Sequence, residues 1–264
     1  MNKDDKKLIY DLLKKADAHI TGYVSEAFKK KLDFTDEIAL SSTTMTNEKP
    51  VAVEPVESTG DVDSSTTDAG TSITNTSGLT LSELYTKIAR CTKCPLARTR
   101  NNVVPGEGVE KPDVLVIGEG PGYDEDMSGR PFVGKAGVLL DKMLAAIGLD
   151  RNKNCYIANV VKCRPPQNRD PLPDEQATCY AFLQAQIHIL KPKMILCMGR
   201  IAGHKMLESQ EAMNKLRGQF FEYNGIPLMV TYHPSALLRD ESLKAPAWQD
   251  LKLFRSRLTE LQNS

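Results

Sequence analysis

The sequence has no long apolar run. Across its 264 residues no stretch approaches the roughly 18 consecutive apolar residues that indicate a membrane-spanning helix. The first seven residues are polar and lead into an amphipathic segment, not into the apolar core of a secretion signal. We therefore expect no membrane association and an intracellular, cytoplasmic protein. In such a reducing compartment the six cysteines are expected to be metal ligands or core thiols, not disulfides.

Aromatic residues and cations are almost missing from residues 41–78. This segment has no aromatic residue, and Lys49 is its only cation. A composition rich in Ser, Thr and acidic residues cannot offset the entropy of ordering, so we predict a flexible linker. Before it, residues 1–40 have the spacing of an amphipathic helix. This helical segment is either a docking helix for a protein partner or an appendage of a domain formed by residues 79–264.

The formal net charge of zero hides an uneven distribution. Residues 1–80 carry 9 Lys and Arg against 14 Asp and Glu, whereas residues 81–264 carry 25 against 20. The acidic arm therefore masks a moderately basic body. A basic body is compatible with a phosphate backbone as partner. A solvated surface of mixed charge explains the same numbers equally well.

Four short apolar runs predict buried parallel strands. They are Val114–Gly118, Tyr156–Val161, Met194–Met198 and Leu228–Tyr232. Helical patterns precede or separate them, at Thr80–Cys91, Gly137–Ile147, Asp174–Leu190 and Ile201–Glu208. This alternation predicts a three-layer α/β/α fold around a central four-stranded parallel sheet. Ligands bind at the carboxyl ends of such strands, where Glu119, Asn159 and His233 are expected to meet.

Four cysteines form two groups. Cys91 and Cys94 make a C-x2-C pair, Cys163 lies 69 positions after Cys94, and Cys179 lies 16 positions after Cys163. Prolines follow Cys94 and Cys163 and would fix the loops around a metal centre. Four thiolates suit either zinc or an iron–sulfur cluster. The wide spacing between Cys163 and Cys179 favours a cluster, with zinc and no metal as the alternatives.

The glycine-rich turn Gly118–Gly122 does not match a nucleotide-binding loop. It lacks the full G-x-G-x-x-G spacing and is not followed by Gly-Lys-Ser/Thr. Further on, Phe132 lies in a loop between a proline and glycines, either as satellite core or as a stacking platform for a base. Asn159 either makes a structural hydrogen bond or pairs with a base edge, because an amide both donates and accepts. His233 is likewise either a structural residue at the end of a strand or a functional residue.

Together these residues resemble the uracil-DNA glycosylase superfamily, and most closely its iron–sulfur family 4 enzymes of bacteria and archaea. The matching motifs are Cys91-x-x-Cys94, Gly118-Glu119-Gly120-Pro121-Gly122, Gly129-Arg130-Pro131-Phe132-Val133-Gly134, Asn159-Val160-Val161-Lys162-Cys163-Arg164-Pro165-Pro166, Cys179 and His233-Pro234-Ser235. They cover nearly all of residues 81–260 in the family's order. Residues 1–80 fall outside the resemblance.

The resemblance implies an enzyme of base excision repair. Such enzymes flip uracil out of single- or double-stranded DNA and hydrolyse its N-glycosidic bond, which leaves an abasic site. The fold implied is a four-stranded parallel sheet with helices on both sides, in a protein that acts as a monomer. The implied cofactor is a structural [4Fe-4S] cluster. Its ligands would be Cys91, Cys94, Cys163 and Cys179.

The resemblance also implies roles for the site residues. Phe132 would stack on the flipped uracil, Asn159 would read its polar edge, and His233 would hydrogen-bond the departing base. The pocket lining would further include Gly118, Glu119, Gly120 and Ser235.

Some relatives carry an Asp that positions the attacking water, and here Gly120 takes that position. Glu119 is our candidate for this role, Asp124 is a second, and a water held by the backbone is a third. After the histidine motif, Leu237 and Leu238 either wedge into the space that the base leaves or pack in the core.

Three rival functions are compatible with parts of this pattern. A related family traps its product covalently through an Arg- and His-rich loop, but residues 164–173 contain no His. A catalytically silent module with a cluster would bind DNA and release no uracil. An electron-transfer protein would leave Phe132, Asn159 and His233 without a purpose. The presence of all three favours the enzyme.

Overall fold

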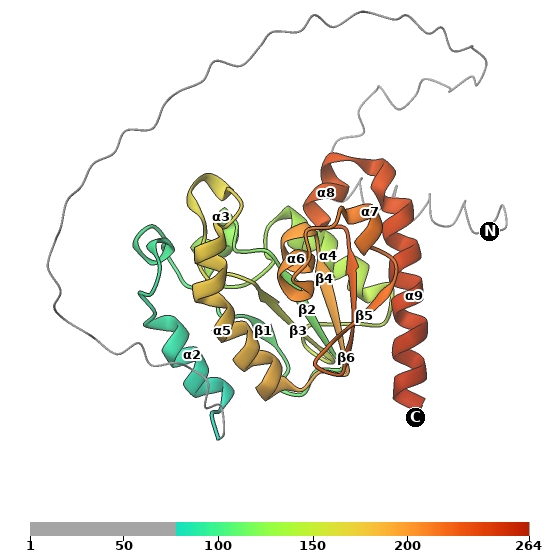
Figure 1. Ribbon diagram of the computed structural model, residues 1–264, viewed down its shortest axis with the longest axis horizontal. Helices are drawn as coiled ribbons and strands as arrows, with labels where there is room; N and C mark the ends of the chain where they lie inside the picture. The colour runs from blue at the N-terminus through green and yellow to red at the C-terminus, as the bar shows by residue number, and fades with distance from the viewer. Residues whose placement is uncertain (1–77, 264) are drawn as a thin grey trace, which may run out of the picture. The chain divides into compact units, whose positions relative to one another are not determined.

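The computed structural model describes residues 78–263. The helix predicted in residues 1–40 and almost all of the linker lie outside the described residues. Six strands form one mixed sheet in the order β1-β3-β2-β4-β6-β5 (Figure 1). The strands are β1 (Glu107–Gly108), β2 (Val114–Gly118), β3 (Cys155–Asn159), β4 (Met194–Met198), β5 (Phe220–Tyr223) and β6 (Ile226–Thr231).

The predicted strand count of four is wrong. The four central strands β3, β2, β4 and β6 pair parallel. β2 and β4 have the predicted bounds, and β3 and β6 overlap their predicted runs with shifts of one or two residues at each end. Two antiparallel strands, β1 and β5, extend the sheet at its edges. β1 has only two residues, too few for an alternating pattern. β5 joins β6 through Asn224-Gly225, where both φ angles are positive, and this pair is a typical signal for a tight hairpin turn.

Helices cover both faces of the sheet. They are α2 (Leu81–Ala89), α3 (Tyr123–Ser128), α4 (Lys135–Ala145), α5 (Pro173–Leu190), α6 (Arg200–Leu207), α7 (Met213–Leu216), α8 (Pro234–Arg239) and α9 (Lys244–Asn263). On one face, Leu115 and Ile117 of β2 pack in a core that takes residues from α2, α5 and α6. On the other, Val114 and Val116 pack with α4 and α9. The alternation of β2 side chains between two cores makes the three-layer arrangement that the sequence predicted.

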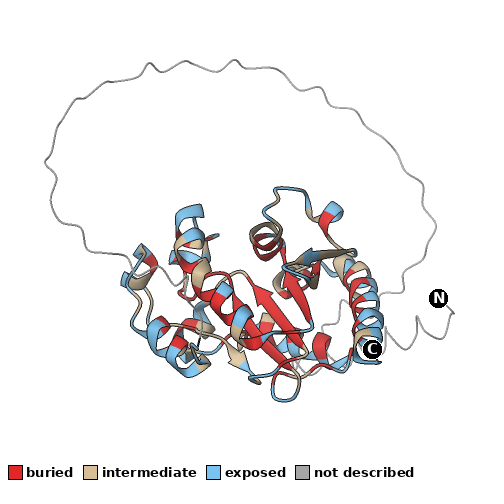
Figure 2. Cartoon of the chain, turned by 60° about the horizontal axis from the view of Figure 1, so that its bottom comes forward, coloured by how far each residue is buried: buried red, intermediate tan, exposed pale blue. Residues whose placement is uncertain are grey.

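The parallel strands β2, β3 and β4 are buried throughout, and β6 is buried from Leu228 to Thr231, as Figure 2 shows in red. Strands covered on both faces read as continuous apolar runs, which is why the sequence identified these four and missed the edge strands. No helix within residues 78–263 combines the length and the apolar character needed to cross a membrane.

The strand order has a switch point between β2 and β4. From β2 the chain continues to β3 on one side, whereas from β4 it continues to β5 and then β6, which both lie on the other side. Loops after β2 and β4 therefore leave in opposite directions. Open α/β sheets bind ligands at such a switch point, beyond the carboxyl ends of the strands. Gly118 ends β2, and Gly199 follows β4, at this edge.

Candidate active site

The pairing of β2 with β3 brings the glycine-rich turn and the Asn159 motif together. Gly118, the last residue of β2, is in register with Asn159, the last residue of β3. A Cβ at Gly118 would collide with Asn159 Oδ1 and with the ring of Phe132. This position therefore requires glycine for a steric reason. The collision also establishes that Phe132 and the Asn159 amide lie against the same point of the sheet edge.

His233 lies next to Phe132. The ring centroids of the two residues are 5.5 Å apart and the planes are inclined by 33°. β6 ends at Thr231, and His233 is the N-cap residue of α8. Gly199, with φ of 89°, passes so close that an added Cβ would lie 2.8 Å from His233 Cβ. The structure thus brings Phe132, Asn159 and His233 together at the carboxyl end of the sheet.

The amide of Asn159 is buried and incompletely satisfied. The residue is 2% exposed. Within residues 78–263, its Oδ1 is the one buried side-chain polar atom that has no hydrogen-bond partner. Buried polar atoms are nearly always hydrogen-bonded, and an exception requires an explanation. An acceptor held ready beside an aromatic ring is suited to a planar polar ligand with an N–H group.

The backbone of Phe132 has an uncommon conformation that Arg151 stabilises. Phe132 has φ of 52°, in the left-handed region that bulky residues rarely adopt. The buried guanidinium of Arg151 donates to the carbonyls of Pro131 at 2.9 Å and Phe132 at 3.0 Å. Arg151 in turn pairs with Asp141 on α4 at 2.7 Å. No motif surrounds Arg151, and the sequence pattern gave no sign of its role.

Glu125 joins the two loops of the pocket. One carboxylate oxygen accepts from the N–H groups of Val133 at 2.8 Å and Gly134 at 3.0 Å, beside Phe132. The other accepts from the N–H of Gly122 at 3.1 Å, in the glycine-rich turn. This residue too was missed from the sequence. Its position three residues after Gly122, at the start of α3, is typical of a helix capping box and could have indicated it.

The tautomer of His233 follows from its neighbours. The backbone N–H of Ser235 donates to His233 Nδ1 at 3.1 Å, and the Ser235 hydroxyl lies 2.8 Å from the same atom. Because a backbone N–H can only donate, Nδ1 is the acceptor and the ring proton of the neutral form is on Nε2. Burial, with a contribution from the positive Arg239, lowers the pKa of His233 to about 4. His233 is therefore a neutral donor at physiological pH.

Glu119 has the electrostatics of a group that gains and loses a proton near neutrality. Burial, and next the negative Asp170, raise its pKa to about 7, against the opposing effect of Arg200 and Arg239. Asp170 itself pairs with Arg200 at 2.5 Å. Asp124, the second candidate for holding water, is exposed on α3. Gly120 packs closely, since a Cβ there would lie 2.7 Å from Val161.

The two leucines after the histidine motif differ in exposure. Leu237 is 2% exposed and belongs to the core, whereas Leu238 is 44% exposed. Packing therefore explains Leu237, and only Leu238 is available as a wedge.

The four predicted metal ligands line one cavity. Cys91, Cys94, Cys163 and Cys179 surround it together with Arg100. Arg100 Nη1 donates to Cys163 Sγ at 2.9 Å, and a backbone N–H donates to Cys179 Sγ at 3.3 Å. Hydrogen bonds to ligand sulfurs are a regular feature of iron–sulfur sites.

The donor set of this cavity fits a cluster. Within the described part of the chain, no three His, Cys, Asp or Glu residues are grouped as a single metal ion would require. Four cysteines that line one cavity are a donor set that fits an iron–sulfur cluster. Burial raises the pKa of Cys163, and it raises that of Cys179 to about 12, so binding must displace protons.

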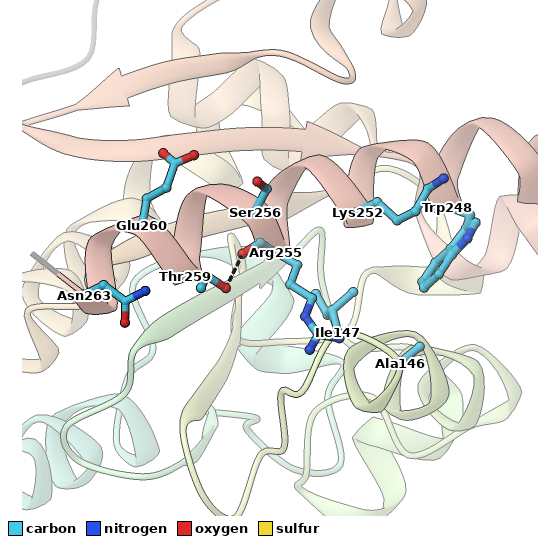
Figure 3. Close-up of a pocket in the computed structure, with 9 residues that line it drawn as sticks. All are labelled: Ala146, Ile147, Trp248, Lys252, Arg255, Ser256, Thr259, Glu260 and Asn263. Carbon is cyan, nitrogen blue, oxygen red and sulfur yellow. Dashed lines mark hydrogen bonds between the residues drawn. The ribbon is translucent and has the colours of Figure 1, made fainter. Parts of the chain in front are cut away.

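A second hollow does not belong to this site. It lies between the end of α4 and α9, as Figure 3 shows. Its lining residues are Ala146, Ile147, Trp248, Lys252, Arg255, Ser256, Thr259, Glu260 and Asn263. None of them is a predicted site residue, so this hollow has no part in the candidate active site.

Comparison with known proteins agrees with this geometry. The model of the uracil DNA glycosylase superfamily matches residues 105–252. The type-4 uracil-DNA glycosylase of Thermotoga maritima is 46% identical over 174 residues, which are 64% of this chain and 90% of that protein. That of Pyrobaculum aerophilum is 41% identical over 182 residues, 66% of this chain and 92% of the relative. That of Archaeoglobus fulgidus is 39% identical over 180 residues, with 65% and 90% covered. The chain belongs to the uracil DNA glycosylase superfamily.

Proposed function

We propose that this protein is a DNA repair enzyme that removes uracil from DNA by hydrolysing its N-glycosidic bond. The observation that carries the proposal is the buried, unpartnered Oδ1 of Asn159 beside the ring of Phe132. The names of its relatives, type-4 uracil-DNA glycosylases, agree with this activity. The substrate is DNA, in which the uracil nucleotide must leave the stack to reach an enclosed site.

Phe132 and Asn159 recognise the base in this proposal. The ring of Phe132 stacks on uracil, and the amide of Asn159 accepts from the base N3–H while it donates to the O4 carbonyl. Cytosine presents the opposite pattern, an acceptor at N3 and an amino group at C4, so the same amide orientation disfavours it. Gly118 keeps the approach free of side-chain atoms, as its steric surroundings require.

His233 stabilises the leaving base. Cleavage of the glycosidic bond places negative charge on the uracil O2 and positive charge on the sugar. The Nε2–H of neutral His233 donates to that oxygen, and Ser235 keeps the ring in the tautomer that can do so. A donor fixed in advance in a buried site stabilises developing charge without reorganisation. A cationic imidazole is unnecessary for this role.

Glu119 positions the water that completes hydrolysis. As a carboxylate it accepts a hydrogen bond from the water and faces the cationic sugar, with the backbone of Gly120 beside it. Leu238, exposed at the end of α8, occupies the space that the flipped nucleotide leaves. Leu237 has no such role because it is buried.

Cys91, Cys94, Cys163 and Cys179 hold a [4Fe-4S] cluster in this proposal. The cluster supplies structural cross-linking between the segment after α2, the loop after β3 and α5. Arg100 and the backbone of Lys162 hydrogen-bond two of the ligand sulfurs. We further propose that the enzyme acts as a monomer in the cytoplasm.

The experiment is uracil release from a defined oligonucleotide. The protein is incubated with DNA that contains one uracil, and alkali then cleaves any abasic site. If the protein is a glycosylase, the DNA should be cut at the uracil position. If it is a catalytically silent module, it should bind the DNA without a cut. His233→Ala should lower the single-turnover rate roughly a hundredfold or more, equivalent to about 3 kcal/mol.

His188→Ala is the matched control for this substitution, because His188 is exposed on α5 away from the site motifs. It should leave the rate unchanged. A His233→Ala protein with full single-turnover rate would remove the proposed role of this residue.

A further inference from the structure

Lys162 is a buried cation whose side chain has no part in the proposed mechanism. It is 1% exposed and lies between Asn159 and the first cysteine of the second group, Cys163. Its ammonium donates to the carbonyl of Asn159 at 2.8 Å and to Gln186 Oε1 at 2.6 Å. None of the salt bridges among residues 78–263 involves Lys162. Both hydrogen-bond acceptors of the ammonium are thus neutral oxygens, and the ionisable groups that interact with its charge are the thiols of Cys179 and Cys163.

Stability alone does not explain a cation at this place. Burying an ammonium is costly, and an apolar side chain of similar size is often neutral or stabilising in such a position. What Lys162 provides instead is a set of hydrogen bonds with fixed directions. Its hydrogen bonds join the end of β3 to α5 through Gln186, which is fully buried and donates to the Pro105 carbonyl at 2.8 Å.

The amide of Asn159 depends on its backbone for its position. Its Oδ1 has no hydrogen bond that would fix the side chain. The peptide that follows Asn159 is held on one side by the bond from Val160 N to the Gly118 carbonyl, at 3.0 Å. Lys162 holds the Asn159 carbonyl on the other side, beyond the last residue of the strand. Displacement of this peptide would displace the amide that faces the base.

We propose that Lys162 is a positioning residue for base recognition, which fixes the Asn159 peptide through its ammonium and anchors it to α5 through Gln186. This inference rests on the proposed function and deepens it. Lys162 does not touch the base. It acts through Asn159, so its loss should affect the reaction of the flipped base more than the binding of DNA.

Two substitutions separate positioning from a structural role. Lys162→Met removes the hydrogen bonds, whereas Lys162→Gln retains an amide that can donate to the Asn159 carbonyl. Single-turnover kinetics on a uracil oligonucleotide give the maximal rate and the half-saturating enzyme concentration. We expect Lys162→Met to lower the maximal rate about tenfold, equivalent to about 1.4 kcal/mol, with half-saturation changed less than twofold. Lys162→Gln should fall between it and the wild type.

If Lys162 has only a structural role, the two variants should rank in the opposite order. Met would then be the better replacement in a buried site, with the higher melting temperature and an activity at least equal to that of Lys162→Gln. That order, or full activity of Lys162→Met, would overturn the proposal.

Gln186→Leu is the second variant, used if both Lys162 variants lose iron or fail to fold. It removes one of the two acceptors of the ammonium and lies away from the cysteines in sequence. We expect it to lower the maximal rate about threefold with the iron content unchanged. An unchanged maximal rate would then refute the proposal. Failure of the proposed function is distinguishable, because it would leave the wild type unable to release uracil.

Discussion

At the scale of single residues, the two titratable groups of the site have opposite protonation preferences. Burial lowers the pKa of His233 to about 4, and burial with Asp170 raises that of Glu119 to about 7. Pairs of groups whose environments separate their pKa values in this way are typical of acid–base assignments in active sites. Here His233 remains a neutral donor across the physiological range, while Glu119 changes charge within it.

The ionisation of Glu119 predicts a pH dependence. If the carboxylate holds the water, the single-turnover rate should fall as the pH drops below about 7, where Glu119 becomes protonated. Glu119→Gln should be slower at pH 8 and should lose this dependence. The measurement is single-turnover rate against pH for both proteins. A wild-type rate that stays constant from pH 8 to pH 5.5 would contradict the assignment.

The same pKa has a consequence for stability. Because the folded pKa lies above the ordinary value of 4.5, the folded state holds more protons than the unfolded state between these values. Stability from this group is therefore present at low pH and is lost as the pH rises through about 7. Glu119→Gln should raise the free energy of unfolding at pH 8 and not at pH 4, as denaturant titration would show.

At the scale of elements, the first helix of the described chain depends on its cap. Thr80 N donates to the Glu83 carboxylate at 2.8 Å, and Glu83 N donates to Thr80 Oγ1 at 3.3 Å. α2 then leads directly to Cys91, so its N-terminal order contributes to the position of the first cysteine pair. Together these two hydrogen bonds form a capping box at the start of the helix that the sequence predicted from Thr80 onward.

Removal of this cap should be measurable. Thr80→Ala should lower the free energy of unfolding by about 1 kcal/mol, because it leaves helix N–H groups without an acceptor. Thr86→Ala, in the same helix, is the control. Thr86 donates only to the Ser82 carbonyl within the helix, so alanine there should be neutral or slightly stabilising. Equal losses from both substitutions would show that the capping box contributes nothing.

At the scale of the whole molecule, the cysteine cavity connects segments distant in sequence. Cys163→Ala should lower iron from about four atoms per chain to near zero and should lower the melting temperature, since ligation is coupled to folding. Cys155→Ala is the matched control. Cys155 is fully buried in β3 and lines no part of the cavity, so that protein should keep its iron. A colourless wild type with one zinc ion would contradict the cluster.

The catalytic body should function without the N-terminal arm. A protein that begins at Gly78 keeps Thr80 and every site residue, and we expect it to fold, bind iron and release uracil. Loss of the acidic arm should tighten DNA binding at low salt, and the difference should shrink as salt rises. Iron content, uracil release and salt titration of binding are the measurements. Loss of iron or activity on truncation would show that residues 1–77 contribute to the domain.

The sequence by itself determined the central strands, and it singled out the cysteine set and the candidate site motifs. Gly118, Asn159 and His233 could be identified because local patterns place them at or just after strand ends. Phe132, in the loop before α4, was identified by its Pro- and Gly-flanked loop motif and by the family resemblance. The two edge strands and α9 were not predicted, because short or half-exposed elements leave only weak hydrophobic patterns in the sequence. Whether Leu237 or Leu238 is exposed could not be settled either, since both have the same local character.

Only the tertiary structure assigned the residues that hold the site in place. Arg151 and Glu125 act on backbone groups of another loop, and Lys162 connects the Asn159 carbonyl to Gln186, 24 residues away on α5. No spacing rule reports such contacts, because they depend on which loops pack together. The raised pKa of Glu119 and the lowered pKa of His233 have the same origin. Burial and neighbouring charges from four different segments produce them, and these are properties of the folded chain alone.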